Sequence, residues 1–203
     1  MKKAFYLFLI GALCAASGFA EEAKAPAAAP TEAEKQAKMA EMQKLMQPGE
    51  NHKALDAIAG KFNATVTMWM EPGKEPEVST GVTENTWIYG GRFLQQKYTG
   101  TFQGQPFEGT GIVGYDNVKK EYISIWYDSM MTGIMSSSGQ YDASTKTLTE
   151  KGAVSCPMSG QKDLPMRTAL TITDNDHHLY ESYAPGPDGK EMKGMSIAYE
   201  RVK

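Results

Sequence analysis

Gly90-Gly91-Arg92-Phe93-Leu94 opens the stretch that decides the fold, which continues through Gly114-Tyr115-Asp116-Asn117 and ends at Ile125-Trp126-Tyr127-Asp128. In this stretch, short β-type runs alternate with glycines and turn residues, a pattern typical of strands that are joined by tight turns. Charged residues lie among the aromatic ones. The stretch therefore predicts β-structure with unusual polar positions, and it does not by itself specify a reaction.

A second signal for β-structure begins after Gly60, where the hydrophobic period changes from helical to two. Phe62, Ala64 and Val66 alternate with polar residues, which is the pattern of a strand with two different faces. Turn signals then recur at short intervals and divide residues 60–203 into about ten strand-length runs. An antiparallel barrel closes such a meander without exposed edges, so we predict one all-β barrel domain; a two-sheet sandwich fits the same pattern.

Residues 31–59 carry a helical pattern. Thr31 and Glu34 have the spacing of a capping box, and Pro48-Gly49 ends the first helix before a second short helical segment. Three methionines recur at helical spacing in the first helix: Met39, Met42 and Met46. We expect this methionine stripe to pack on the barrel or close it.

The first twenty residues are typical of a signal peptide. Lys2 and Lys3 precede a short apolar run, and small residues lead to Ala20, after which we expect cleavage. Residues 21–30 form an Ala/Pro linker with no apolar face, which predicts disorder. We therefore expect a protein that is exported to the periplasm or secreted. No later run approaches the roughly twenty apolar residues that a membrane-spanning helix needs.

The charge pattern argues against nucleic acid as a partner. The formal net charge is −3, and lysines and arginines are scattered singly along the chain, whereas nucleic-acid-binding proteins concentrate them on one face. Cys156 is the one cysteine left after removal of the signal peptide, so it has no internal disulfide partner and is expected to be buried as a small apolar residue. The sequence specifies neither a cofactor nor an oligomeric state.

A series of short motifs follows in order along residues 40–202: His52-Lys-Ala-Leu-Asp56, Ala59-Gly-Lys-Phe62, Met68-Trp-Met-Glu-Pro-Gly73, Gly90-Gly-Arg-Phe93, Pro106-Phe-Glu-Gly109, Gly114-Tyr-Asp-Asn117, Trp126-Tyr-Asp128 and Gly186-Pro-Asp-Gly-Lys190. In this order they resemble the bacterial family known as domain of unknown function 1579. The resemblance implies a calycin-like β-barrel, similar in outline to lipocalins, fatty-acid-binding proteins and the haem-binding nitrobindins, and no settled activity. The Gly-x-Trp-x-Gly-x-Gly signature of nitrobindins is absent, which argues against haem binding of the nitrobindin kind in this chain.

Three candidate ligand-binding residues lie in the opening stretch. If Arg92 projects into the barrel it could hold a carboxylate or phosphate; alternatively it pairs with Asp116 or Asp128 at a barrel end. Trp126 and Asp128 share one face of their strand because side chains alternate along a strand. The period of two does not tell whether that face is the interior.

Three further candidates lie in later strands: Arg167, His178 and Tyr199. Asp174-Asn-Asp-His-His178 contains metal-capable side chains, but Asp-Asn-Asp is common turn chemistry and adjacent histidines on a strand point to opposite faces, so we favour a turn over a metal site. We expect the many methionines to fill the core rather than to bind Cu(I). The common catalytic motifs are absent, and no catalytic residue is predicted.

Three functions fit these patterns. We favour a non-enzymatic exported protein that binds a small apolar or amphipathic ligand inside the barrel. A haem or metal protein, or an enzyme that uses one inward histidine or acid, is the second hypothesis. The third is a barrel with a packed interior that acts through protein interaction.

Overall fold

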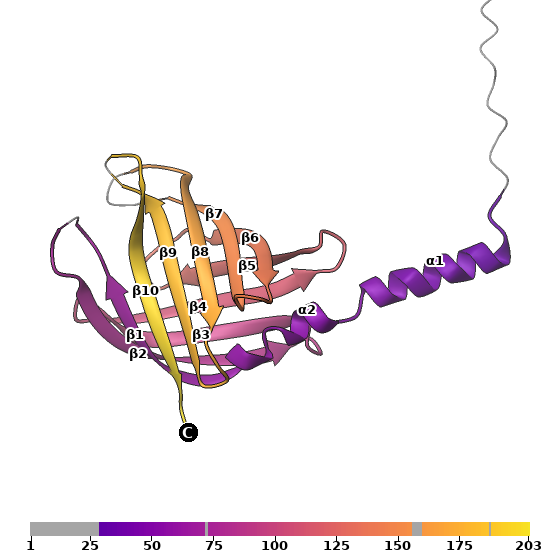
Figure 1. Cartoon of the computed structure of the whole chain (residues 1–203), viewed down its shortest axis with the longest axis horizontal. Helices are drawn as coiled ribbons and strands as arrows, with labels where there is room; N and C mark the ends of the chain where they lie inside the picture. The colour runs from indigo at the N-terminus through magenta and orange to yellow at the C-terminus, as the bar shows by residue number, and fades with distance from the viewer. Residues whose placement is uncertain (1–28, 72, 156–159, 187) are drawn as a thin grey trace, which may run out of the picture.

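Ten antiparallel strands close into one barrel in the computed structural model of the chain, which describes residues 29–71, 73–155, 160–186 and 188–203 (Figure 1). The predicted all-β antiparallel barrel of about ten strands is confirmed, and the sandwich alternative is wrong. The predicted signal peptide, most of the 21–30 linker and Cys156 lie outside the described residues. The strands are β1 (Gly60–Met68), β2 (Glu77–Ile88), β3 (Phe93–Phe102), β4 (Gln105–Asp116), β5 (Glu121–Asp128), β6 (Met135–Asp142), β7 (Thr147–Val154), β8 (Leu164–Ile172), β9 (His177–Pro185) and β10 (Glu191–Arg201).

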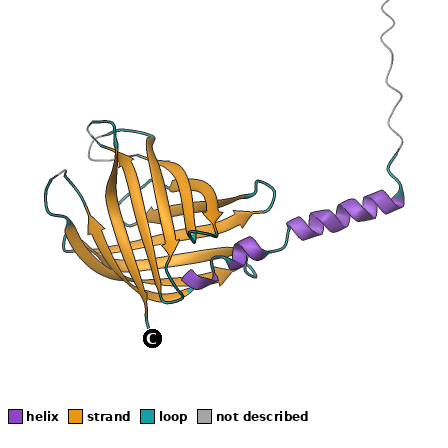
Figure 2. Cartoon of the chain, in the orientation of Figure 1, coloured by secondary structure: helices purple, strands orange, loops and turns teal. Residues whose placement is uncertain are grey.

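Each strand pairs with its neighbours in sequence, and β1 pairs with β10 to close the ring. At this seam Phe62 lies opposite Arg201 and Met68 lies opposite Met195. Because side chains alternate between two faces, the registers place every second residue of a strand inside the barrel, and a register shift between Lys193 and Met195 interrupts this alternation in β10. Strand connections alternate between the two ends of the barrel (Figure 2). We call the end where β1 begins and β10 finishes the closed end, and the opposite end the open end.

The closed end is filled by α2 (Glu50–Lys53) and the 3-10 helix η1 (Asp56–Ile58), together called the plug. Leu55 is 1% exposed and Ile58 is fully buried, and both belong to one core cluster with Leu94 and Tyr122 from the barrel. Burying a side chain of this size stabilises a fold by about 1.5–3 kcal/mol. The plug therefore forms part of the core.

Arg201, at the end of β10, holds the plug by its backbone carbonyls. Its guanidinium donates hydrogen bonds to Ala57 O and Ala59 O, each at 2.8 Å, and to Asn175 O at 2.6 Å. The same group lies 4.4 Å from the centroid of the Phe62 ring. Carbonyls at the end of a helix have no partner within it, so Arg201 satisfies groups that would otherwise be left without one.

The first helix, α1 (Glu32–Leu45), begins at the predicted capping box, in which Thr31 and Glu34 exchange hydrogen bonds. It ends beside the turn between β4 and β5. There Asn117 Nδ2 donates to Leu45 O at 2.9 Å and to Gln47 O at 2.8 Å, which satisfies carbonyls at the helix end. These bonds attach α1 to the barrel at its C-terminal end.

The rest of α1 extends away from the barrel, and none of its residues is buried (Figure 1). The prediction that the methionine stripe packs on the barrel is wrong, because Met39, Met42 and Met46 are each more than half exposed. The plug fills the closed end instead. The helix ends before Pro48-Gly49, so only its C-terminal end contacts the barrel.

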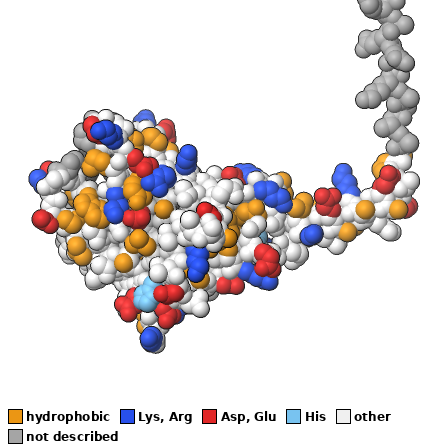
Figure 3. All heavy atoms as spheres, in the orientation of Figure 1, with side chains coloured by type: hydrophobic (Ala, Val, Ile, Leu, Met, Phe, Trp, Pro, Cys, Tyr) orange, Lys and Arg blue, Asp and Glu red, His pale blue; other side chains and the backbone are white. Residues whose placement is uncertain are grey.

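Acidic and basic side chains are interspersed on the face of the molecule shown in Figure 3, and neither sign dominates it. Across the described part of the chain, every helix is too short or too polar to cross a membrane.

Candidate functional site

Two apolar clusters divide the barrel interior along its axis. One joins the plug to the closed end. The other lies toward the open end and is built on the buried side chains of Ala64, Val66 and Tyr98. Inward-facing polar residues lie beside this second cluster. We use the term inner lining for Tyr98, Phe107, Ser124, Trp126, Ser137, Glu150, Tyr180, Met195, Ile197 and Tyr199.

The inner lining is packed less tightly than the closed end. Trp126, Tyr180 and Tyr199 point into the barrel, yet each keeps part of its surface accessible. By contrast, Leu55 and Leu94 at the closed end are at most 1% exposed. The interior is therefore solid at one end and accessible toward the other. A barrel of eight or more strands is wide enough to enclose a small ligand.

Inward-facing glycines allow two rings of the inner lining to lie against the barrel wall. A Cβ atom added at Gly109 would collide with the Trp126 ring, and one added at Gly81 would collide with the Tyr98 hydroxyl. Glycine within a strand commonly marks such a close approach. Because these rings occupy the space beside the wall, they line the interior rather than fill its centre.

Trp126 and Asp128 both face the interior, which answers the question that the sequence pattern left open. Trp126 Nε1 donates to Asp128 Oδ2 at 3.0 Å. The other carboxylate oxygen of Asp128 accepts hydrogen bonds from the backbone N–H groups of Met130 and Met131, at 2.9 and 3.1 Å. Asp128 thus stabilises the turn after β5 and fixes the Trp126 ring at the open end.

Arg92 lies outside the interior, in the turn between β2 and β3 at the closed end. Its guanidinium donates to Tyr89 O at 2.9 Å and to Met46 O at 2.9 Å, at the end of α1. The predicted pairing with Asp116 or Asp128 is wrong. Asp116 instead accepts backbone hydrogen bonds in its own turn, and Asp128 lies at the opposite end of the barrel.

Replacing Arg92 with methionine is expected to loosen α1 while leaving ligand binding unchanged. Loss of the bond to Met46 O should cost about 1 kcal/mol of stability. Hydrogen–deuterium exchange should accelerate in residues 46–49 and in the turn after β2, where the bond to Tyr89 O is also lost. The matched control is Lys97→Met, which removes an exposed cation from the outer face of β3. Unchanged exchange in the Arg92 variant would show that this side chain does not hold the helix.

Arg167 also lies outside the interior, because its neighbour Thr168 faces inward on β8. Its guanidinium forms two hydrogen bonds with Glu191, at 2.9 and 2.6 Å, and lies 3.9 Å from the centroid of the Tyr183 ring. The pairing with Glu191 raises the pKa of Arg167. These contacts tie three strands together on the outer face, so a ligand inside the barrel would not reach Arg167.

His178 and Tyr199 face inward, side by side on β9 and β10. The two rings stack with centroids 4.3 Å apart, and the edge of the Phe62 ring lies 4.5 Å from His178. His178 is 4% exposed. Burial, with a smaller contribution from the positive charge of Arg201, lowers the pKa of His178 to about 4, so the imidazole is neutral at pH 7. Its position is that of a core residue, whereas Tyr199 reaches the accessible part of the interior.

Glu150 is an inward-facing residue that the sequence analysis missed. It is 5% exposed, and its carboxylate accepts hydrogen bonds from Ser124 Oγ at 2.8 Å and from Ser137 Oγ at 3.3 Å. Burial raises the pKa of Glu150, and the two serines partly offset this. The signal that could have revealed it is its period of two with Leu148 in a strand whose other face carries Thr149 and Lys151.

Comparison with known proteins identifies the family. Residues 47–201 match the family described as Protein of unknown function (DUF1579). The chain belongs to this family. No curated protein matches the chain significantly.

Solved structures that resemble this DUF1579 protein share its barrel. Rv2717c from M. tuberculosis is 13% identical, with a TM-score of 0.57, and the match covers 77% of this chain and 100% of that one. The S-type phycobiliprotein lyase CPES from Guillardia theta is 8% identical, with a TM-score of 0.51, covering 75% of this chain and 93% of that one. At these identities the likeness shows the fold alone.

The acidic run before His178 forms a turn in this DUF1579 protein, as the sequence predicted. Asp174 Oδ1 accepts the backbone N–H groups of Asp176 and His177, at 2.7 and 2.8 Å. His177 is exposed and His178 is buried, so the two rings lie on opposite faces of β9. Among the residues that the structure describes, no three His, Cys, Asp or Glu side chains are grouped to hold a metal ion.

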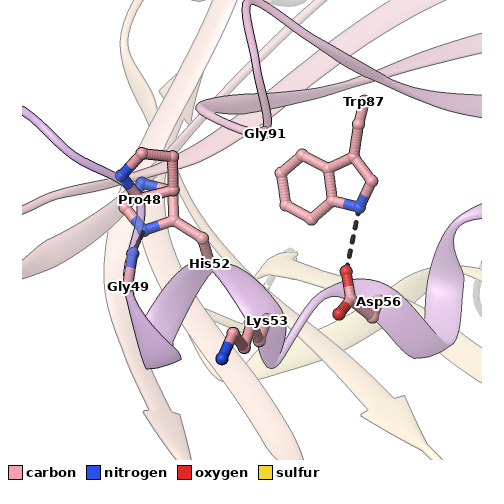
Figure 4. Close-up of a pocket in the computed structure, with 7 residues that line it drawn as sticks. All are labelled: Pro48, Gly49, His52, Lys53, Asp56, Trp87 and Gly91. Atoms are coloured by element: carbon pink, nitrogen blue, oxygen red, sulfur yellow. Dashed lines mark hydrogen bonds between the residues drawn. The ribbon is translucent and has the colours of Figure 1, made fainter.

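A shallow cleft of about 270 Å³ lies outside the barrel, between the plug and the turn after β2 (Figure 4). Its polar groups already have partners within the protein. Trp87 Nε1 donates to Asp56 at 2.9 Å, His52 Nδ1 accepts the N–H of Gly49 at 3.1 Å, and Lys53 pairs with Glu50. Burial, followed by the charge of Arg92, lowers the pKa of His52. This cleft is the seam between plug and barrel, and the interior is the better candidate site.

Proposed function

We propose that this DUF1579 protein is a non-enzymatic, exported binding protein that holds a small apolar or amphipathic ligand inside its barrel. The observation that carries the proposal is the accessible surface of deep, inward-facing side chains such as Trp126, Tyr180 and Tyr199. Ligand sites are concave and mostly apolar, with a few polar groups that orient the ligand. The inner lining has this composition.

The open end gives the ligand its route of entry. The plug fills the closed end with apolar side chains, and Arg201 donates hydrogen bonds to the backbone carbonyls of the plug. At the other end the apolar cluster includes Met68, Phe107 and Met195, which are only partly buried. Methionine side chains are flexible and adapt to ligands of different shape. Entry between them would require no movement of the plug.

A pair of serine substitutions tests whether binding occurs inside the barrel. Ser182 faces inward beside Met195, and Ser136 is exposed on the outer face of β6. Ser182→Trp should fill the interior and weaken binding of the neutral fluorescent dye N-phenyl-1-naphthylamine at least about tenfold, because the added ring occupies the ligand's place. Ser136→Trp, measured by the same fluorescence titration, should bind the dye as the unaltered protein does. Equal affinities of the two variants would place dye binding elsewhere.

Protein purified from its own host provides the second readout. Its native mass spectrum should contain a complex with a small molecule, and the mass of the polypeptide should correspond to cleavage after Ala20. A polypeptide that retains residues 1–20 would contradict export. A Soret band or a stoichiometric metal in the same sample would favour the haem or metal alternative.

A further inference from the structure

The inward-facing positions of the barrel carry an unbalanced set of charges. Glu150 lies within the inner lining, and Asp128 and Glu77 lie nearer the open end. Of the inward-facing strand positions that the structure describes, Arg201 alone is a lysine or arginine, and it lies at the closed end beside Asp176. The accessible part of the interior is therefore acidic.

Glu150 is the most deeply buried of these acids. Its two hydrogen-bond donors, Ser124 and Ser137, are neutral hydroxyls, and within the described chain no lysine, arginine or histidine lies within ion-pair distance of it. A buried charge without a partner of opposite sign is costly, and proteins usually pair it. The raised pKa of Glu150 is consistent with this unpaired state. The described residues supply no cation that pairs with this carboxylate.

Aromatic rings surround the same space. Trp126 and Tyr98 lie against glycines of the wall, and Phe107 packs edge to face on Tyr98 with ring centroids 5.8 Å apart. Tyr180 and Tyr199 face inward from β9 and β10. The faces of such rings attract organic cations through their quadrupoles, most strongly when water is excluded. A carboxylate among aromatic rings is the chemistry that recognises alkylammonium groups.

We propose that the ligand is an organic cation: an amphiphile whose amine or quaternary ammonium head lies among the aromatic rings near Glu150, with its apolar body toward the methionines of the open end. This inference rests on the proposed function. It excludes fatty acids and other anionic amphiphiles as preferred ligands, because their carboxylate would meet Glu150 and Asp128, and no described inward-facing strand position at this end carries a lysine or arginine.

Three probes with the same alkyl chain test the inference in the unaltered protein by isothermal titration calorimetry: decyltrimethylammonium, decanol and decanoate, each below its aggregation concentration. Decyltrimethylammonium should bind about tenfold more tightly than decanol, and decanoate more weakly than both, in line with the strength of desolvated cation–π contacts. If none of the probes binds, the proposed function fails. If decanol or decanoate binds as tightly as the cation, the proposed function stands and the inference about charge fails.

Glu150→Gln assigns the preference to this carboxylate. The variant keeps the shape of the side chain and should reduce affinity for decyltrimethylammonium about tenfold while leaving decanol binding unchanged. The matched control is Glu84→Gln on the exposed outer face of β2, which should change neither affinity. Retained decanol binding reports that the variant is folded. A Glu150→Gln protein that keeps the full preference for the cation would overturn the assignment.

Discussion

Replacing Arg201 with methionine is expected to lower the free energy of unfolding by roughly 3–4 kcal/mol, because several backbone carbonyls lose their hydrogen-bond donor at once. Ala57 O and Ala59 O lie in the plug, and Asn175 O lies in the turn before β9. Methionine is apolar and can still pack on Phe62, so the loss reports the polar contacts. Urea unfolding, followed by circular dichroism, measures the change.

Arg167→Met is the matched control for Arg201→Met. Arg167 is also an arginine with a hydrogen-bonded partner, but that partner, Glu191, is exposed on the outer face. Exposed ion pairs of this kind contribute roughly 0–1 kcal/mol. A loss of stability in the Arg201 variant no larger than that in the Arg167 variant would show that the plug is held by apolar packing alone.

The second large effect is a dependence of stability on pH that originates in His178. The pKa of this imidazole is lowered to about 4 in the folded protein, against an ordinary value of 6.5. Between these values the unfolded chain binds a proton that the folded protein does not, so acid favours unfolding. The contribution of His178 to the free energy of unfolding should fall as pH decreases from 6.5 to 4, by on the order of 3 kcal/mol, and should level off below pH 4. Glu150, whose pKa is raised, acts in the opposite direction as pH falls.

Two neighbouring histidines allow this effect to be isolated. His178→Phe keeps an aromatic ring between Phe62 and Tyr199 and should remove the loss of stability that His178 causes between pH 6.5 and 4. His177→Phe alters an exposed ring and should retain the dependence. Chemical denaturation of both variants at several pH values makes the comparison. An identical pH profile in His178→Phe and the unaltered protein would refute the assignment to His178.

Local patterns in the sequence predict the strands well, because period-two alternation and turn residues are themselves local. Phe62, Ala64 and Val66 share one face of β1 as predicted, and the Asp174 turn forms between β8 and β9. Thr31 likewise caps α1. The pairing of β1 with β10 could be expected only from the general rule that unpaired N–H and C=O groups of edge strands are unfavourable, which closing the sheet avoids.

The candidate site was harder to predict because it depends on which face of each strand is inside. Trp126, Asp128, His178 and Tyr199 do point inward, whereas Arg92 and Arg167 do not. An arginine in a sequence can indicate an anion-binding site, but its guanidinium is equally suited to donating hydrogen bonds to carbonyls at a helix end. Whether these six residues contact a ligand remains a prediction.

Glu150 shows the opposite difficulty. In the sequence it stands in a run of threonines and lysines, which is the composition of a solvated strand. Its burial follows from the pairing of β7 with β6 and β8, which brings Ser137 from one neighbour close to its carboxylate. The period of two shows that Glu150 shares a face with Leu148, but the pairing of the strands decides that this face is inside.

The seam between β1 and β10 has a mechanical consequence. It is the one junction in the ring of strands that pairs the first strand with the last, and Val202 N–H still bonds Lys61 O there at 2.9 Å. The two strands are antiparallel, so the start of β1 and the end of β10 lie together. A force that pulls these two points apart therefore loads the rungs of the seam one after another instead of shearing them together. The contacts of Arg201 with the plug are the first to bear that load. Arg201 is therefore expected to resist mechanical unfolding as well as denaturation.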